Sequence, residues 1–422
     1  MNCKITPSTL SGSIHIPASK SEAHRILICA ALSDRQTSVI CPETNQDIDA
    51  TADCLRALGA DIVRTETGFI VTPIGDRPRE NPVLDCGESG STLRFLLPVC
   101  AALGVNAAFT GRGRLPQRPL SPLYELLSEN GCTLSPQGAF PLKLSGKLRC
   151  GEYSIAGDVS SQFISGLLMA LPAAGGESNL TVTGKMESAP YIAITEKILA
   201  DFGRAPKRKD NVFSLPGGRY ISRGTYTAGG DWSSAAFWLC AGALNNGGLT
   251  VTGIDPGSAQ GDKAVLEVLR RFGADVTIRE MSVTVSPGKL TGIRIDASDI
   301  PDLVPILSVV ACAAQGETVF ENAGRLRIKE SDRLQAICSA LGALGAEVSD
   351  TPDTLTVTGS GALTGGRAAA LNDHRIAMMC AVASIICRGS VTVTGAQCVR
   401  KSYPAFFEDF KTLGGIVETE VD

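Results

Sequence analysis

The chain repeats one pattern of apolar and polar segments at a nearly constant interval. In each copy a helix-like run ends at a glycine, and a β-like run usually follows. Six such glycines recur along the chain: Gly59, Gly131, Gly203, Gly273, Gly345 and Gly414. Their successive numbers differ by 72, 72, 70, 72 and 69. Glycine at a helix C-terminus provides the left-handed backbone conformation that ends the helix, so the spacing predicts six structural repeats.

A second series of residues marks the start of one helix in each repeat. Each member lies at or just before a run of small and apolar residues: Ser19, Glu88, Asp158, Asp231, Asp302 and Asp373. Successive members differ in number by 69, 70, 73, 71 and 71. Side-chain oxygens accept hydrogen bonds from free N–H groups at a helix start, and negative charge suits that end of the helix. Ser19 with Glu22 also fits a capping box.

The first repeat shows the order of elements that we expect in all six. After a short strand come an apolar helix (21–33), a strand (38–42), an amphipathic helix (49–59) and two strands (61–65 and 68–73). Helices with little polar face are buried, whereas amphipathic helices keep one face toward solvent, so we expect the second helices to lie outside. The pattern predicts an α/β protein of six βαβαββ units.

The period alone leaves the grouping of the six units open. A regular repeat also suits an elongated solenoid, in which each unit contacts only its neighbours. The glycine-rich segment TYTAGGDWSS (225–234) is a candidate crossover between two sets of three units.

Composition narrows the class of protein. The 422 residues suffice for two or three domains, and the net charge of −4 argues against a protein held to nucleic acid by its overall field. The longest apolar runs, such as 376–387, fall short of the roughly 20 residues that cross a bilayer, and the first residues show no export signal. Fourteen cysteines without a CxxC pair, and only three histidines, argue against zinc and for reduced thiols. We expect a cytoplasmic protein that binds neither nucleic acid, membrane nor metal.

Cations recur at the predicted helix starts. Lys20, Arg25, Arg94 and Arg375 lie beside the capping positions of three repeats. Any one of them alone is most simply a solvated surface charge. Because free N–H groups and the helix dipole both favour anions, their recurrence at matched positions indicates a site for a multiply charged anion.

The segment RIKESDRLQAI (327–337) holds the densest charge. We expect it to start a helix on which Lys329 and Arg333, four residues apart, share a face, and on which Glu330 can pair with Arg333. Arg118 precedes a proline in a predicted loop, and Lys401 does so in RKSYP. A solvated helix start would explain most of this pattern as well.

Two further segments offer uncharged hydroxyl and amide groups that can bind an anion. DVSSQF (158–163) and ESAPY (187–191) offer serines that suit phosphate or sugar hydroxyls, although serines at helix starts are more often caps. GESGST (87–92) lacks the spacing of a nucleotide P-loop, and no Rossmann fingerprint is present.

Eight segments occur together in the order of one known family. They are PASKSEAHR, GESGSTLRF, LPQRPLSP, GDVSSQF, IPDLVPIL, RIKESDR, NDHRIAM and RKSYPAFFE. Over essentially its full length the chain resembles the EPSP synthase family, the 3-phosphoshikimate 1-carboxyvinyltransferases. The resemblance implies two domains, each of three βαβαββ units around a pseudo-threefold axis (an inside-out α/β barrel), with the active site in the cleft between them. The domains would be 1–19 with 231–422, and 20–230.

The resemblance also implies the reaction and its substrates. The enolpyruvyl group of phosphoenolpyruvate would pass to the 5-hydroxyl of shikimate 3-phosphate with release of phosphate, by a monomer without a cofactor. Because both substrates are anions, the cleft must gather cations that would repel one another when it is empty, so closure can depend on substrate charge.

Site residues follow from the matching motifs. Asp302 would accept the 5-hydroxyl proton, Glu330 would protonate the methylene carbon, and Lys20 would assist phosphate departure. The residues implied for phosphoenolpyruvate are Lys20, Gly90, Arg94, Arg118, Lys329, Arg333, Arg375 and Lys401. Those implied for shikimate 3-phosphate are Lys20, Ser21, Arg25, Ser160, Ser161, Gln162, Ser188, Asp302 and Lys329.

Two positions depart from the commonest family pattern, and two other functions remain as alternatives. Glu88 stands where many members have Asn, and Arg325 where some use Asn toward the shikimate phosphate, so local binding details are open.

UDP-N-acetylglucosamine enolpyruvyl transferase shares the fold and donor, but its Lys-Asn pair and loop cysteine are missing here: Ser21 follows Lys20, and the segment 110–122 contains no cysteine. A non-catalytic polyanion-binding scaffold would explain the cations but would not need Asp302 or Glu330.

Overall fold

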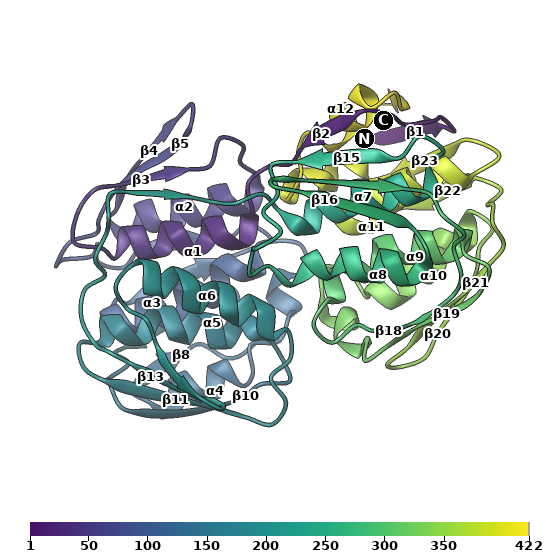
Figure 1. The fold of residues 1–422 in the computed structure, drawn as a ribbon. Coiled ribbons are helices and arrows are strands. Elements are labelled where there is room, and N and C mark those ends of the chain that lie inside the picture. The colour runs from purple at the N-terminus through teal and green to yellow at the C-terminus, as the bar shows by residue number, and fades with distance from the viewer. Residues whose placement is uncertain (421–422) are drawn as a thin grey trace. The chain divides into compact units, whose positions relative to one another are not determined.

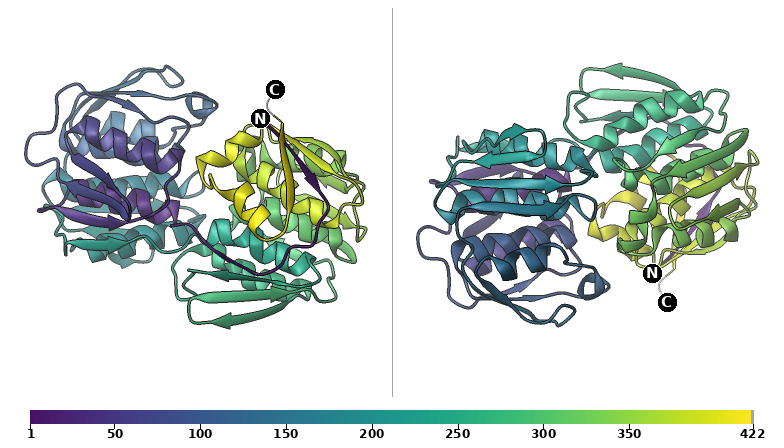
Figure 2. Two further views of the ribbon diagram at one scale, coloured as in Figure 1. Left: turned by 90° about the horizontal axis from the view of Figure 1, so that it is seen from above. Right: turned by 90° about the horizontal axis from the view of Figure 1, so that it is seen from below.

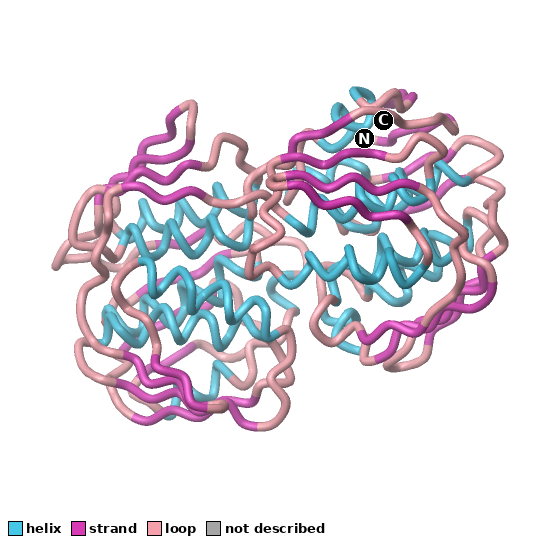
Figure 3. The backbone as a smooth tube through the Cα atoms, in the orientation of Figure 1, coloured by secondary structure: helices cyan, strands magenta, loops and turns pink. Residues whose placement is uncertain are grey.

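The computed structural model describes residues 1–420, which form two compact units. The N-unit is Ala18–Ala228, and the C-unit joins Met1–Pro17 to the chain from Gly229 onward. Each unit contains three four-stranded sheets. In each unit the strands lie toward the outside and the helices toward the inside (Figures 1 and 3). This is the inside-out arrangement expected for βαβαββ units, and it excludes the elongated solenoid.

The elements of the N-unit follow the predicted order. Its helices are α1 (Lys20–Ala31), α2 (Gln46–Leu58), α3 (Gly90–Leu103), η1 (Leu115–Gln117), α4 (Leu123–Glu129), α5 (Ser161–Ala170), η2 (Leu171–Ala174) and α6 (Ala189–Asp201). Its strands are β3 (Thr37–Ile40), β4 (Asp61–Thr65), β5 (Gly68–Thr72), β6 (Val83–Asp85), β7 (Ala107–Thr110), β8 (Cys132–Leu134), β9 (Leu142–Gly146), β10 (Glu152–Ala156), β11 (Ser178–Thr183), β12 (Lys207–Lys209), β13 (Val212–Leu215) and β14 (Thr225–Thr227).

The C-unit repeats this order. Its helices are α7 (Trp232–Leu244), η3 (Gly261–Ala264), α8 (Val265–Phe272), η4 (Pro301–Leu303), α9 (Val304–Ala313), η5 (Gly324–Ile328), α10 (Arg333–Ala343), α11 (His374–Ala383), η6 (Ser384–Ile386), η7 (Ala396–Lys401) and α12 (Phe406–Thr412). Its strands are β1 (Asn2–Thr6), β2 (Ser13–His15), β15 (Leu249–Thr252), β16 (Asp275–Arg279), β17 (Ser282–Ser286), β18 (Arg294–Asp296), β19 (Gly316–Glu321), β20 (Glu347–Asp350), β21 (Leu355–Gly359), β22 (Gly366–Ala369), β23 (Val391–Thr394) and β24 (Ile416–Glu420).

Three sheets are completed by strands from far along the sequence. In a typical sheet, β6 pairs in parallel with β7, and β7 pairs antiparallel with β9. The first sheet of the N-unit takes its parallel strand from β14, with Tyr226 opposite Val39. The strand before α1 instead joins the C-unit, where β2 pairs with β15. The last sheet of the C-unit takes β1 between β23 and β24, and Figure 2 shows this purple strand among yellow elements.

The capping glycines take the conformation that the period predicts. All six have positive φ, between +70° at Gly203 and +113° at Gly59. At Gly59 the backbone N–H bonds back to Arg56 and Leu55, which closes the end of α2. Asp373 accepts from the N–H of Arg375 as the cap of α11, as the second series predicts for a helix start.

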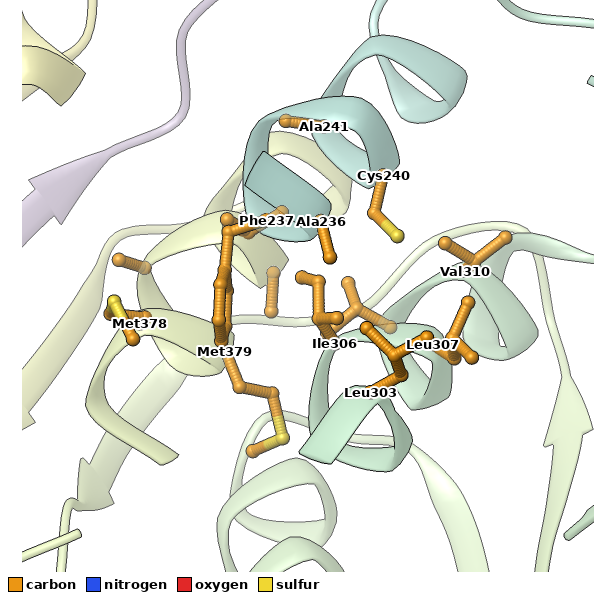
Figure 4. Packing of buried hydrophobic residues seen from close by; sticks show 14 of the residues in the cluster. Ala236, Phe237, Cys240, Ala241, Leu303, Ile306, Leu307, Val310, Met378 and Met379 are labelled. Atoms are coloured by element: carbon orange, nitrogen blue, oxygen red, sulfur yellow. The ribbon is translucent and has the colours of Figure 1, made fainter. Parts of the chain in front are cut away.

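Apolar first helices form the centre of the C-unit. Side chains of α7, η4, α9 and α11 converge there, as Figure 4 shows for Phe237, Leu307 and Met379. The second helices keep an exposed face, as on α8, where Val265 and Leu269 are buried while Glu267 and Arg270 are exposed. Packing of the apolar helices leaves their N-terminal ends to carry the charged residues.

The prediction for 327–337 is wrong in its boundary. Helix α10 begins at Arg333, because Asp332 caps it by accepting from the N–H of Gln335. Lys329 is extended, with φ −84° and ψ −157°, and lies outside the helix. Lys329 and Arg333 therefore do not share a helical face.

Candidate functional site

In the C-unit, the buried guanidinium of Arg333 donates hydrogen bonds to three carboxylates. The side chain of Arg333 is 1% exposed. Its Nη1 donates to Asp302 Oδ1 at 2.7 Å, its Nη2 to Glu330 Oε2 at 2.5 Å, and its Nε to Asp373 Oδ2 at 2.8 Å. The rigid fork of arginine fixes these carboxylates relative to one another. The two residues predicted to carry the acid–base chemistry, Asp302 and Glu330, are therefore adjacent and oriented.

Asp302 is shared with two further cations. Arg375 Nη2 donates to Asp302 Oδ2 at 3.0 Å, and Arg375 Nη1 donates to the Asp302 carbonyl at 3.2 Å. Lys329 Nζ lies 3.6 Å from Asp302 Oδ1. Asp302 therefore lies between the charged groups of Arg333, Arg375 and Lys329.

The charge network shifts the pKa values of two of these cations in opposite directions. Burial would lower the pKa of Arg333, but Asp373, Glu330 and Asp302 outweigh it and raise the pKa above its ordinary value. For Lys329, burial dominates and lowers the pKa to about 8, helped by the nearby Arg333 and Arg325 and opposed by Asp302 and Glu330. Arg333 is thus permanently charged, whereas Lys329 titrates just above neutral pH.

Lys401 joins the same group through the turn before α11. Its Nζ donates to the carbonyl of Asn372 at 2.6 Å. Asn372 has φ +57° and Leu371 has φ +50°, and both are backbone conformations that non-glycine residues rarely adopt. The turn also leads into Asp373 and Arg375, so it fixes three charged side chains of the site at once.

The contacts within the C-unit bear on the repulsion that is expected among the cations of the cleft. From the sequence, the cations of the site are expected to repel one another without substrate. In the C-unit, Lys329, Arg333 and Arg375 instead each lie beside a carboxylate. Arg333 pairs in addition with Glu330 and with Asp373, whose side chain is 0% exposed, so three carboxylates accompany these three cations.

In the N-unit, a buried guanidinium is held by uncharged acceptors. Arg25 is 2% exposed. Its Nε donates to Thr195 Oγ1 at 2.6 Å, its Nη2 to Ser165 Oγ at 3.2 Å and to the Tyr191 carbonyl at 3.1 Å, and its Nη1 to the Ser21 carbonyl at 2.6 Å. Burial accordingly lowers the pKa of Arg25 to about 10. None of these four hydrogen bonds goes to a carboxylate.

Arg94 and Gln162 join the helix starts of α3 and α5. Arg94 Nη1 donates to Gln162 Oε1 at 2.7 Å, and Gln162 Nε2 donates to Ser91 Oγ at 2.9 Å. Arg94 Nη2 donates to the carbonyl of Pro119, next to Arg118. The amide of Gln162 is therefore fixed in orientation, and residues predicted for both substrates lie in one bonded chain.

Gly90 allows Arg118 to approach the start of α3. A Cβ atom at Gly90 would lie 2.6 Å from Nη1 of Arg118, which is too close for a non-bonded contact. On α1, Lys20 Nζ pairs with Asp47 Oδ2 at 2.9 Å. Lys20, Gly90 and Arg118, all predicted to contact phosphoenolpyruvate, thus have defined positions within the N-unit.

The predicted serines lie at helix starts. Ser160 caps α5 by accepting from the N–H of Gln162, and Ser161 is the first residue of that helix. Ser188 precedes α6, is 2% exposed and has φ +53°. A serine in a left-handed conformation is strained, and such strain concentrates at functional sites.

The two departures from the family pattern lie at the edges of these clusters. The carboxylate of Glu88 lies so close to Gly113 that a Cβ atom there would collide with it. Glu88 therefore packs against the loop that leads to Arg118. Arg325 belongs to η5 and contributes to the lowered pKa of Lys329.

Sequence reasoning missed several residues that support the site. Asp47 pairs with Lys20, and Asp373 pairs with Arg333. Asp373 belongs to the series of capping residues, so its repeat position signalled a helix start but not an ion pair. Asp47 carried no signal, because a charged residue in the first turn of a helix is common.

Two other classes of site lack support in the described chain. None of the helices within residues 1–420 is long and apolar enough to cross a membrane. Across the same residues, no group of three or more His, Cys, Asp or Glu side chains is arranged to hold a metal ion.

Comparison with known proteins gives one family. Residues 5–410 match the family described as EPSP synthase (3-phosphoshikimate 1-carboxyvinyltransferase). The 3-phosphoshikimate 1-carboxyvinyltransferase of Clostridium kluyveri is 41% identical over 416 residues, which cover 98% of this chain and 97% of the relative. That of Clostridium acetobutylicum is 42% identical over 424 residues, covering 99% and 98%.

Solved structures share the fold. EPSP synthase from Acinetobacter baumannii has a TM-score of 0.83 at 26% identity, over 99% of this chain and 100% of that one. The enolpyruvyl transferase NikO from Streptomyces tendae has a TM-score of 0.79 at 18% identity, over 100% of this chain and 99% of that one, which shows the fold alone. The fold class predicted from the repeat and the motifs is confirmed.

Proposed function

We propose residue roles from one premise: the chain belongs to the EPSP synthase (3-phosphoshikimate 1-carboxyvinyltransferase) family. It is an enzyme of the shikimate pathway of aromatic amino acid biosynthesis. It transfers the enolpyruvyl group of phosphoenolpyruvate to the 5-hydroxyl of shikimate 3-phosphate and gives 5-enolpyruvylshikimate 3-phosphate and phosphate.

The C-unit half-site carries the acid–base chemistry in this proposal. Asp302 takes the proton of the 5-hydroxyl as its oxygen bonds to C2 of phosphoenolpyruvate, and Glu330 gives a proton to the methylene carbon C3. In the second step C3 returns a proton to the Glu330 carboxylate, the C2=C3 bond re-forms and phosphate leaves, with Lys20 assisting its departure. This assignment rests on the hydrogen bonds from Arg333 to both carboxylates, at 2.7 Å to Asp302 and 2.5 Å to Glu330.

Substrate binding is divided between the units. Cations of both units bind phosphoenolpyruvate: Lys20, Arg94, Arg118, Lys329, Arg333, Arg375 and Lys401, with Gly90 giving room to Arg118. Shikimate 3-phosphate is bound by Lys20, Ser21, Arg25, Ser160, Ser161, Gln162, Ser188, Asp302 and Lys329. Uncharged acceptors around Arg25 support this, because they leave its charge for an anion.

Assembly and location belong to the proposal as well. We infer that the two half-sites act on one pair of substrates, and that the protein works as a cytoplasmic monomer without a nucleic-acid or membrane partner. Free thiols at all fourteen cysteines are consistent with a reducing compartment.

The test is phosphate release from phosphoenolpyruvate by the purified protein, with shikimate 3-phosphate and with UDP-N-acetylglucosamine in parallel. We expect release only with shikimate 3-phosphate. Release only with the nucleotide sugar would assign the chain to the sister activity. If folded protein releases no phosphate with either acceptor, the proposed roles are contradicted.

A further inference from the structure

Asp262 is a buried carboxylate beside the C-unit half-site that none of the roles above uses. It lies in η3 and is 4% exposed. The preceding Gln260 ties η3 to the start of α7, because its side chain accepts from the N–H of Trp232 at 3.1 Å and donates to the carbonyl of Gly230 at 2.9 Å. The position of Asp262 is therefore fixed relative to α7.

A hydroxyl and a guanidinium connect Asp262 to Asp302. Arg375 Nη2 carries two hydrogens; it donates to Ser233 Oγ at 2.8 Å and to Asp302 Oδ2 at 3.0 Å. Ser233 has one hydrogen, and its hydroxyl bonds to Oδ2 of Asp262. Since Arg375 donates to the serine oxygen, the serine hydrogen points to Asp262. Arg375 thus donates to both Asp302 and Ser233, and Ser233 donates to Asp262, so a series of three hydrogen bonds joins Asp302 to Asp262.

The charged groups that face Asp262 come from three elements. Asp231 precedes α7, Asp302 belongs to η4, and Arg375 comes from α11. The adjacent Lys263 donates instead to the carbonyl of Pro256. Helix α8 packs against η3, but its charged side chains lie on its exposed face: Glu267, Arg270 and Arg271. Asp302 and Arg375 are thus the site residues that sense the charge of Asp262.

The two carboxylates influence each other's protonation. Burial, and next the charge of Asp302, raise the pKa of Asp262 to about 6, although Arg375 and the Ser233 hydrogen bond oppose the rise. Coulombic coupling is mutual, so an ionised Asp262 also increases the proton affinity of Asp302. A carboxylate with greater proton affinity is a better acceptor for a hydroxyl proton.

We propose that Asp262 is a positioning residue: through Ser233 and Arg375 it orients the guanidinium that holds Asp302 and makes Asp302 a stronger base toward the 5-hydroxyl of shikimate 3-phosphate. The inference rests on the proposed function. The step that it affects breaks the O5–H bond and the π bond between C2 and C3 of phosphoenolpyruvate. It forms an O–H bond on Asp302, the O5–C2 bond, and a C3–H bond with the proton from Glu330; Asp262 itself receives no proton. Asp262 therefore acts by charge and orientation.

The test compares the pH dependence of phosphate release in three variants. Asp262→Asn keeps the shape and removes the charge. We expect kcat to fall about ten-fold on the plateau, as for a weaker base, with the KM for phosphoenolpyruvate within about three-fold. The acid limb of kcat/KM should move to lower pH, because Asp302 without its neighbour's charge protonates at lower pH. Ser233→Ala should shift the limb in the same direction by less, because the lost hydrogen bond leaves Asp262 more often protonated.

Glu267→Gln is the matched control, since it removes one carboxylate from the exposed face of α8 in the same unit. Its profile should match the wild type. Asp262→Asn with lower activity but an unmoved acid limb would show a structural role only and overturn the inference. If Asp262→Asn does not fold, judged by circular dichroism, an unmoved limb in Ser233→Ala overturns it equally. A wild type that releases no phosphate with shikimate 3-phosphate would overturn the proposed function first, and the inference with it.

Discussion

Arg25 in the N-unit and Arg333 in the C-unit are both buried, at 2% and 1% exposure, yet their partners differ in charge. Thr195, Ser165 and two backbone carbonyls accept from Arg25, whereas three carboxylates accept from Arg333. The pKa of Arg25 is lowered to about 10 by burial, while that of Arg333 is raised by its carboxylates. The same residue type therefore serves two purposes.

The difference shows how a site for anions can also contain acids and bases. In the N-unit, neutral acceptors fix a cation without pairing its charge with a carboxylate, which suits the binding of an anion that we propose for Arg25. In the C-unit, the cation cancels carboxylate charge, so that ionised carboxylates can remain buried near an anionic substrate. In the proposed function, this difference assigns anion binding to Arg25 in the N-unit and proton transfer to the carboxylates around Arg333 in the C-unit.

The largest expected effect tests that assignment at Glu330. Glu330→Gln can still accept from Arg333 but has no acidic proton to give. We expect kcat to fall by about a thousand-fold, within the range for loss of a general acid, with substrate KM values within about three-fold. Steady-state phosphate release measures both, with the exposed Glu347→Gln as the control. Turnover within about ten-fold of the wild type would remove Glu330 from the chemistry.

A pair of stability measurements tests the comparison directly. Arg333→Met leaves three carboxylates without their cation, and breaking a buried charge network of this kind costs about 3–5 kcal/mol. Arg25→Met leaves Thr195 and Ser165 bonded to each other at 2.9 Å, so its cost should be about 1–2 kcal/mol. Thermal and urea unfolding of both variants give the two losses.

Equal losses of unfolding free energy in Arg333→Met and Arg25→Met would contradict the difference between the two guanidiniums. Arg25→Met should in addition raise the KM for shikimate 3-phosphate by about a hundred-fold, because it removes a charge that is directed at the substrate. An unchanged KM would mean that Arg25 acts within the fold only.

The pKa of Lys329 predicts how the KM for phosphoenolpyruvate should depend on pH. Its pKa of about 8 means that it is protonated at pH 7 and mostly neutral at pH 9. Loss of this cation should raise the KM for phosphoenolpyruvate about ten-fold between those two values. Lys329→Arg should abolish the rise, because guanidinium keeps its proton. A rise that persists in Lys329→Arg would have to come from another group.

The smallest expected effect concerns steric room in the N-unit. Gly90→Ala places a Cβ atom against Arg118, whose guanidinium must move by a few tenths of an ångström or more. We expect the KM for phosphoenolpyruvate to rise by about three- to ten-fold with kcat nearly unchanged, since binding but not proton transfer is disturbed. Gly342→Ala, an exposed helical position with open space around it, is the control. A change in kcat alone would contradict this separation of roles between the units.

Much of the fold could be predicted from the sequence because its signals are local. A glycine that ends a helix shows its role through its immediate neighbours, as Gly59 and Gly273 do. The pairing of β14 with β3 could not be predicted in this way, because it depends on packing between segments at opposite ends of the N-unit: Tyr226 lies opposite Val39. The start of α10 was misplaced because Asp332 competes for the capping role within one charged run.

The site was predictable where motifs name residues and not where partners are distant. Asp302 and Glu330 follow from the family pattern, and the pairing of Glu330 with Arg333, predicted from their spacing, is confirmed; the attachment of Asp302 to Arg333 required the structure. Asp47, Asp262 and Ser233 have no distinctive spacing, and only the packing of helices brings them to the charged residues. The functional groups were thus easier to predict than the groups that hold them.

Strand β1 has a consequence for the order of events during synthesis. Cys3 pairs with Val393 and with Thr419, so β1 is made long before the strands that it joins and must wait for them. At the usual rate of roughly 5–20 residues per second, that delay is about 20 to 80 s. The N-unit segment is translated completely in that interval. The last sheet can close only after β1 and β24 have both been made, so its closure joins segments that are translated far apart in time.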